Sequence, residues 1–222
     1  MLQILGDTLP LAVGVAVSPV PIIATILMLL SPRAGGTSLG FLAGWVLGIA
    51  VALTVFIVLS SLIEGGNADG PRPIAAIAKL GIGALLILLA LRQWRSRPAA
   101  GETAELPKWM SAIDTMTPLR AAGLGAALAA ANPKNLLLAA SAGISIGASA
   151  SLATTIGTAV IFVVLAAASV AAPVIAYLAA PARLADWLAA LKEWLVSHNA
   201  TIMAVLLLVI GVAVLGKGLA TF

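Results

Sequence analysis

The motif Asn-Pro-Lys-Asn at residues 132–135 lies inside an otherwise apolar stretch that covers about residues 119–140. If this stretch crosses a membrane, Lys134 lies near the depth of the lipid tails. A charged side chain at that depth is unfavourable by about 2.5 to 3.5 kcal/mol, and such residues usually face a cavity or a partner and mark a pathway. Lys134 is therefore the first candidate for a functional residue.

The composition is that of an integral membrane protein. Of the 222 residues, 62% are hydrophobic and 9% are charged, and the mean hydropathy is +1.15, whereas soluble proteins carry about 25% charged residues. The net charge of +4 does not indicate a nucleic-acid partner, because the basic residues form no basic face with interleaved aromatic rings. The chain has no cysteine, which excludes disulfides and cysteine-based metal sites.

Six stretches each supply the roughly 20 apolar residues that cross about 30 Å of hydrocarbon. Backbone groups in a membrane must be satisfied within the segment, so these stretches should be helices. The sequence thus predicts an all-α, polytopic membrane protein with six transmembrane helices. The predicted spans are residues 8–30, 37–60, 73–91, 119–140, 152–178 and 199–219.

The distribution of lysine and arginine predicts the orientation in the membrane. Cytoplasmic loops are enriched in these residues, so the more basic side is assigned to the cytoplasm and both termini to the outside of the cytoplasmic membrane. Residues 93–118 then form a cytoplasmic linker. Residues 181–197, where leucine and tryptophan recur at helical spacing, are predicted to form an amphipathic helix in the interface. The basic residues are Arg33, Arg92, Arg95, Arg97, Lys108, Arg120, Arg183 and Lys192 on the cytoplasmic side, and Arg72, Lys79 and Lys217 on the other.

An offset of 114 residues aligns the Ser-Pro-Val-Pro motif at residues 18–21 with residues 132–135, which indicates an internal repeat. Each half, residues 1–92 and residues 119–222, would hold three spans. An odd number of spans inverts the second half relative to the membrane, as in many secondary transporters. The sequence therefore predicts two inverted three-helix repeats.

Three prolines occur at the aligned positions. Pro19, Pro21 and Pro133 should break or kink the first and fourth spans at matching depth, because proline removes a backbone donor and clashes with the preceding turn. Interrupted helices at corresponding positions of two repeats point to a transport site near the middle of the membrane. The alternative is that these prolines only bend the helices for packing.

A ridge of glycines follows the second span at a spacing of four residues: Gly36, Gly40, Gly44 and Gly48. Small residues at this spacing allow another helix backbone to approach closely. We assign this glycine ridge to helix packing. The neighbouring helix could be the fifth predicted span of the same chain or a helix of a second protomer, so a homodimer is one possibility.

The Pro-x-Pro element, the Asn-Pro-Lys element and the three-plus-three arrangement around a hydrophilic loop resemble the lysine-exporter superfamily. The resemblance is to its actinobacterial branch of peptidoglycolipid- or sulfolipid-addressing proteins, and it covers nearly the whole chain. It implies a protein that moves complex envelope glycolipids toward the cell surface, whereas other branches export amino acids or divalent cations.

The predicted spans contain no aspartate or glutamate, so we expect neither a membrane-buried metal site, which usually needs carboxylate ligands, nor a cofactor. The polar residues that remain at depth are Lys134, Asn132, Asn135 and, across the repeat, Ser18. This set suits an anionic headgroup, with Lys134 engaging the charge and the other three residues forming hydrogen bonds. Lys134 could instead carry a proton in an antiport cycle, or donate to carbonyls released by the prolines and so brace the two spans.

These residues favour a membrane transporter, not an enzyme, whose substrate is an envelope glycolipid or another anionic amphiphile. One alternative is an exporter of small solutes such as amino acids. The other is a non-transporting membrane subunit that assists an envelope-lipid synthase or export machinery. The sequence carries no Gly-x-x-x-x-Gly-Lys-Ser/Thr nucleotide-binding motif, so the energy would come from a gradient, from the substrate's own concentration difference or from a partner.

Overall fold

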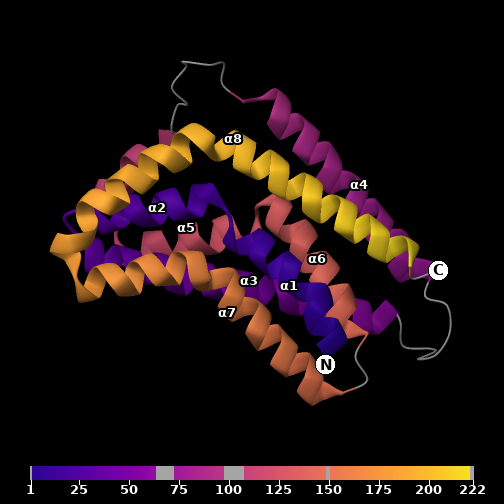
Figure 1. The fold of residues 1–222 in the computed structure, drawn as a ribbon. Helices are drawn as coiled ribbons and strands as arrows, with labels where there is room; N and C mark the ends of the chain where they lie inside the picture. The colour runs from indigo at the N-terminus through magenta and orange to yellow at the C-terminus, as the bar shows by residue number, and fades with distance from the viewer. Residues whose placement is uncertain (1, 64–72, 98–107, 149–150, 221–222) are drawn as a thin grey trace.

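The computed structural model describes residues 2–63, 73–97, 108–148 and 151–220. These residues form an all-α fold, as the sequence predicts (Figure 1). In chain order the described elements are α1 (Leu2–Ala16), α2 (Pro19–Leu29), α3 (Ala34–Ile63), α4 (Pro73–Arg95), the 3-10 helix η1 (Lys108–Thr115), α5 (Pro118–Ala130), α6 (Pro133–Gly147), α7 (Leu152–Ala179) and α8 (Pro181–Leu219).

Four of the described helices are long and apolar enough to cross a membrane: α3, α4, α7 and α8. The pair α1 and α2, which corresponds to the first predicted span, also qualifies as one broken span with a bend of 50°. The fourth predicted span is divided into α5, of 13 residues, and α6, of 15 residues. At 1.5 Å per residue each is about 20 to 22 Å long, which is shorter than the hydrocarbon layer of about 30 Å.

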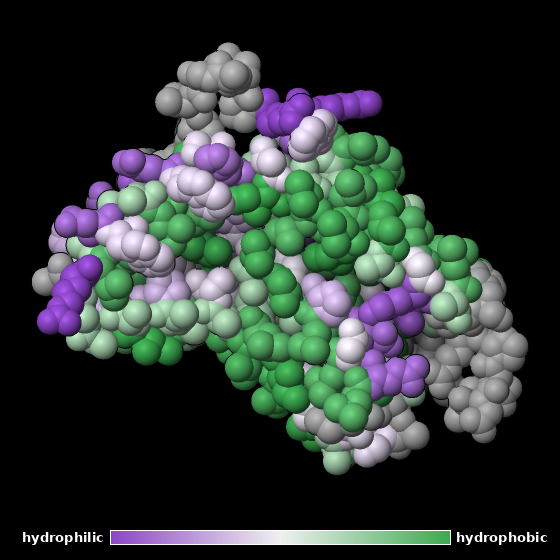
Figure 2. Space-filling model, in the orientation of Figure 1, coloured by the Kyte–Doolittle hydropathy of each residue, from purple (hydrophilic) through white to green (hydrophobic). Residues whose placement is uncertain are grey.

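The surface has the polarity expected of a membrane protein. In Figure 2, apolar side chains cover the middle of the face shown, and hydrophilic side chains gather at its left and lower right. Large apolar side chains on three long helices are more than half exposed, among them Leu47, Val164 and Val209. An apolar surface of this extent marks contact with lipid or with other proteins, and together with the candidate spans it makes the chain a multi-pass membrane protein.

The glycine ridge of α3 lies against α5 of the same chain, which belongs to the fourth predicted span and not to the fifth. A Cβ added to Gly44 would lie 2.8 Å from the Cα of Ala122, and one added to Gly48 would lie 2.7 Å from the Cβ of Ala129. Gly36 and Gly40 face Pro118 in the same way. The two helix backbones are therefore in direct contact along the ridge, with no room for a second protomer between them.

Helices α4 and α8 form a second close pair. Gly83 lies against Gly211 and Leu215, and Leu80 lies against Gly218, so residue numbers rise along α4 as they fall along α8. The pair is antiparallel, and it runs along one side of the molecule (Figure 1).

The amphipathic segment at residues 181–197 is not separated from the last predicted span. Both belong to α8, a single helix of 39 residues that bends as it passes from orange to yellow in Figure 1. Of its apolar side chains, Leu188 and Leu195 are buried against the rest of the protein, whereas Trp187 and Trp194 are more than half exposed. The segment thus packs one edge on the bundle and presents its indole rings outward.

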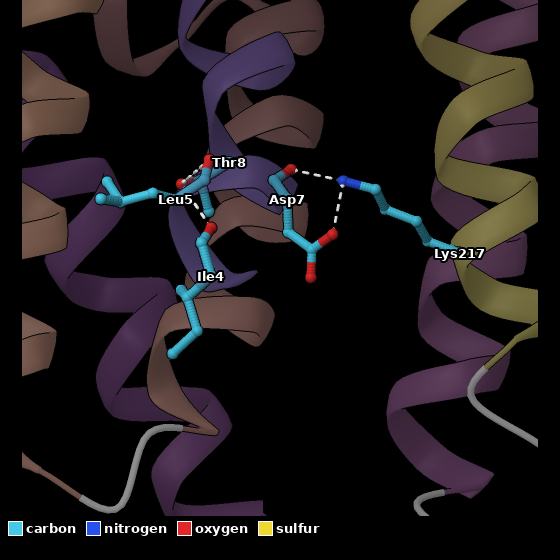
Figure 3. A network of polar contacts seen from close by, with 5 residues as sticks. All are labelled: Ile4, Leu5, Asp7, Thr8 and Lys217. Carbon is cyan, nitrogen blue, oxygen red and sulfur yellow. Dashed lines mark hydrogen bonds and ion pairs between the residues drawn. The ribbon is translucent and has the colours of Figure 1, made fainter. Parts of the chain in front are cut away.

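An ion pair links the beginning of α1 to the end of α8 (Figure 3). The ammonium nitrogen of Lys217 lies 3.0 Å from Oδ1 of Asp7 and donates a hydrogen bond of 2.7 Å to the backbone carbonyl of the same residue. The two ends of the described chain therefore lie at the same end of the helical bundle.

Candidate functional site

The first helix break lies between α1 and α2. Ser18 has an extended backbone (φ −123°, ψ 99°), and its amide donates to the carbonyl of Ala16 instead of to Gly14. Pro19 and Pro21 follow directly and have no amide hydrogen to donate to the preceding turn. The break therefore leaves the carbonyl oxygens of Gly14 and Val17 without the helical partners that a continuous helix would supply.

The second helix break lies between α5 and α6. Asn132 caps α6, because its Oδ1 accepts a hydrogen bond of 3.0 Å from the backbone amide of Lys134. Pro133 occupies the first helical position, where an amide hydrogen would have no partner within the helix. The side-chain amide of Asn135 donates to the carbonyl of Leu128 at 3.1 Å and so satisfies the last turn of α5.

Lys134 connects the two breaks. Its side chain is only 3% exposed, and its Nζ donates to the carbonyl of Gly14 at 2.7 Å and lies 3.5 Å from the carbonyl of Val17. A residue of the second break thus satisfies the carbonyl oxygens that the first break releases. Among the described residues no carboxylate forms an ion pair with this ammonium, so carbonyl dipoles alone stabilise it.

Ser169 of α7 completes the first break. Its hydroxyl donates to the carbonyl of Ala16 at 2.5 Å. Side chains of α6 and of α7 therefore both donate hydrogen bonds to the carbonyls of the first break. The sequence alone does not distinguish Ser169 as a site residue. The available signal was the one hydroxyl between Thr158 and Tyr177 in the fifth predicted span, which alone does not indicate its partner.

The other predicted site residues lie close to the breaks, but not all of them contact Lys134. Ser18 is 2% exposed, and among the described residues no hydrogen bond joins its side chain to Lys134. Asn135 is 3% exposed, and its Oδ1 is buried without a hydrogen-bond partner in the described part of the chain. Asn132 is partly exposed. Asn135 thus retains an acceptor that a ligand could use.

No cluster of three or more histidine, cysteine, aspartate or glutamate side chains that could hold a metal ion occurs among the described residues. The arrangement at the breaks is instead a single buried cation with amide and hydroxyl neighbours. Such a site can exchange carbonyl oxygens for the oxygens of an anionic group.

Two apolar grooves involve the helices that begin at the breaks, α2 and α6. The first, which we call the α8 groove, has a volume of about 680 Å³ and includes Ser169 at the first break. The second, the α4 groove, has a volume of about 310 Å³ and is formed by α3, α4 and α6. The α8 groove is lined by Ile22, Ser169, Ala172, Pro173, Ala176, Arg183, Leu184, Trp187, Leu191 and Leu195. The α4 groove is lined by Phe56, Leu59, Ser60, Ile74, Ala75, Ala78, Ile82, Ala140 and Ile144.

A family model described as Sap, sulfolipid-1-addressing protein, matches residues 8–220. The chain belongs to the Sap family. This confirms the predicted resemblance to sulfolipid-addressing proteins, and the match covers both breaks and both grooves of the Sap-family chain. No curated protein and no solved structure matches it.

Proposed function

We propose that this Sap-family protein moves an anionic envelope lipid across the cytoplasmic membrane. The family description names sulfolipid-1, a lipid substrate is consistent with the two apolar grooves, and an anionic group is consistent with the buried Lys134. The observation that carries the proposal is the position of the two grooves at opposite ends of the bundle.

The contacts between α4 and α8 support this position. The α4 groove uses residues 74–82 of α4, and this part of α4 lies against the last turns of α8 near Gly218. The α8 groove uses residues 183–195 at the beginning of α8. From Leu195 to Leu215 is 215 − 195 = 20 residues, about 30 Å measured along the helix, so the two grooves are well separated along α8. Each groove would therefore open to a different leaflet.

The proposed architecture has six spans in two inverted halves, with α1 plus α2 and α5 plus α6 each acting as one interrupted span. The order of elements supports it, because a broken pair followed by two long helices occurs twice. The packing supports it as well: α5 lies against α3 and α1 lies against α7, while α4 pairs with α8. The grooves follow the same relation. The α8 groove is lined by α2, α7 and α8, and the α4 groove is lined by the corresponding helices of the other half, α6, α3 and α4.

In the proposed mechanism Lys134 has two roles. In the conformation described here its ammonium braces the breaks through the carbonyls of Gly14 and Val17. When an anionic headgroup enters from a groove, the ammonium transfers its hydrogen bonds to the headgroup oxygens. Asn132, Asn135 and Ser18 then donate to or accept from the rest of the headgroup. The change between conformations would be driven by the difference between their affinities for the headgroup.

The test is a lipid-movement assay with the purified protein in vesicles that contain phosphatidylglycerol with a fluorescent, dithionite-sensitive headgroup label. The protein should expose inner-leaflet label to dithionite, and Lys134→Gln should abolish this movement. The matched control is Lys192→Gln, which removes a lysine from α8 outside both grooves and should leave the rate unchanged.

Two results would contradict parts of the proposal. Undiminished movement by a folded Lys134→Gln protein would exclude a substrate role for this ammonium. No movement by the wild-type chain alone would contradict the transporter proposal and favour the non-transporting subunit. Export of amino acids from loaded vesicles without lipid movement would favour the small-solute exporter.

A further inference from the structure

The α8 groove combines an apolar lining with one charged side chain. Arg183, in the first turn of α8, is exposed and is the charged residue among those that line the groove. Within the described residues its guanidinium forms no ion pair, although Asp186 lies three residues further along the same helix. An exposed guanidinium without an ion-pair partner can bind a phosphate, sulfate or carboxylate group through two parallel hydrogen bonds.

On α7, the lining of the groove begins at Ser169 and continues to Ala176, close to the end of that helix. Ser169, at its inner end, lies 179 − 169 = 10 residues before Ala179, the last residue of α7. This separation is about 15 Å along the helix, or half of the hydrocarbon thickness of about 30 Å. Arg183 lies just beyond Ala179, so a lipid with its headgroup at Arg183 would extend its acyl chain to Ser169.

The inner end of the groove meets the first helix break. Ser169 donates to the carbonyl of Ala16, and the next carbonyl, that of Val17, lies 3.5 Å from the ammonium of Lys134. A chain bound in the groove would therefore end beside the residues that would have to move during transport.

The two grooves differ in charge. The α4 groove is lined by apolar residues and Ser60, with no charged side chain. The α8 groove has Arg183 and the indole of Trp187, which is 58% exposed and belongs to the residue type that prefers the membrane interface. Selection of an anionic lipid would therefore occur at the α8 groove only.

From these observations we infer that the α8 groove is the site that captures the anionic membrane lipid, with the headgroup on Arg183 and one acyl chain along α7 as far as Ser169. This inference rests on the proposed lipid substrate. It adds the groove in which the lipid is captured and the residue that selects its headgroup.

Quenching of Trp187 by brominated lipids tests this capture site. The protein for the test keeps Trp187 and the buried Trp45 and has phenylalanine in place of Trp94, Trp109 and Trp194; a Trp187→Phe version gives the background. Dibrominated phosphatidylglycerol should bind beside Trp187 with about fivefold preference over dibrominated phosphatidylcholine. Arg183→Gln should remove this preference, whereas Arg120→Gln, at an exposed arginine of α5 outside the groove, should retain it.

A second pair of variants tests the acyl-chain path. Ala176→Phe fills the groove and should reduce quenching by both lipids, whereas Ala190→Phe, at an exposed alanine of α8 outside the groove, should not. Equal quenching by the two lipids in the parent protein, or an unchanged preference in Arg183→Gln, would overturn the inference. Weak quenching that Ala176→Phe does not alter would also overturn it and would indicate that a second copy of the chain covers the groove.

The binding and transport assays test the capture site and the transporter proposal separately. A protein that prefers the anionic lipid at Trp187 but moves no lipid retains the capture site and contradicts the transporter proposal. A protein that moves labelled phosphatidylglycerol at the same rate with Arg183→Gln, and shows no preference at Trp187, retains the transporter proposal and contradicts the capture site.

Discussion

Lys134 reaches the carbonyl oxygens of Gly14 and Val17 because the first break leaves both without an amide donor. The amide of Ser18 donates to Ala16 instead of to Gly14, and Pro21 has no amide hydrogen for Val17. A buried ammonium normally needs a carboxylate partner. Here the helix break supplies carbonyl dipoles instead, and the lysine supplies the donors that the break lacks. The lysine and the first break thus stabilise each other, although they are 120 residues apart in the sequence.

Replacing Lys134 should therefore lower the stability of the protein. Lys134→Met keeps the length and apolar part of the side chain but leaves two buried carbonyls without a donor. Each unsatisfied group costs about 1 to 3 kcal/mol, so the free energy of unfolding in detergent should fall by at least about 1 kcal/mol. Lys192→Met is the control and should change it by less than about 0.5 kcal/mol. Equal stability of the two variants would show that the carbonyl contacts contribute nothing.

The ion pair between Asp7 and Lys217 should matter less than the contacts of Lys134. The two side chains are 38% and 30% exposed, and partly exposed pairs contribute about 0 to 1 kcal/mol. Asp7→Asn should therefore reduce the free energy of unfolding by no more than about 1 kcal/mol, and the difference should shrink in 1 M salt, where the Debye length is about 3 Å. A larger loss that does not respond to salt would contradict the electrostatic explanation.

At the scale of helices, the glycine ridge holds α3 against α5. The Cβ of an alanine at position 44 would lie 2.8 Å from the Cα of Ala122, a distance that forces the two backbones apart. Overpacking of this kind typically costs about 1 to 3 kcal/mol.

Gly44→Ala should therefore reduce the free energy of unfolding by about 1 to 3 kcal/mol. The matched control is Gly123→Ala on α5, where nothing lies within 4 Å of the added Cβ. That change should be neutral or stabilising by up to about 1 kcal/mol, because alanine is the better helix former. Unfolding of both variants in the same detergent measures the difference. A stabilised Gly44→Ala protein would mean that α3 and α5 do not pack as described.

The sequence predicts the helices better than it predicts their contacts. The all-α fold and the family follow from composition and motifs, and the structure does interrupt the helices at the predicted prolines. The glycine spacing predicts a close helix contact, but it does not indicate α5 as the partner. Ser169 and the two grooves were missed, since each depends on residues from two or three helices that are distant in the sequence.

For the whole molecule, the ion pair between Asp7 and Lys217 predicts a topology, because it joins the beginning of α1 to the end of α8. If these two positions lie on the same side of the membrane, the number of crossings is even. Helices α3, α4, α7 and α8 give four crossings, and the pairs α1 plus α2 and α5 plus α6 must either both cross, giving six, or both not cross. The segment that follows α4 distinguishes these two topologies, because it lies on the opposite side from both chain ends with six crossings and on their side with four.

Cysteine labelling decides between six and four crossings, and it is clean because the chain has no cysteine of its own. Suitable exposed positions are Gln3 in α1, Ser96 after α4 and Ala220 after α8. With six crossings and the basic side inside, Gln3→Cys and Ala220→Cys should react with a membrane-impermeant maleimide in intact cells, and Ser96→Cys should react only after permeabilisation. With four crossings all three would lie on one side and label alike. Labelling of Gln3→Cys and Ala220→Cys from opposite sides would contradict the contact between the chain ends, and a reversed pattern would place both termini in the cytoplasm.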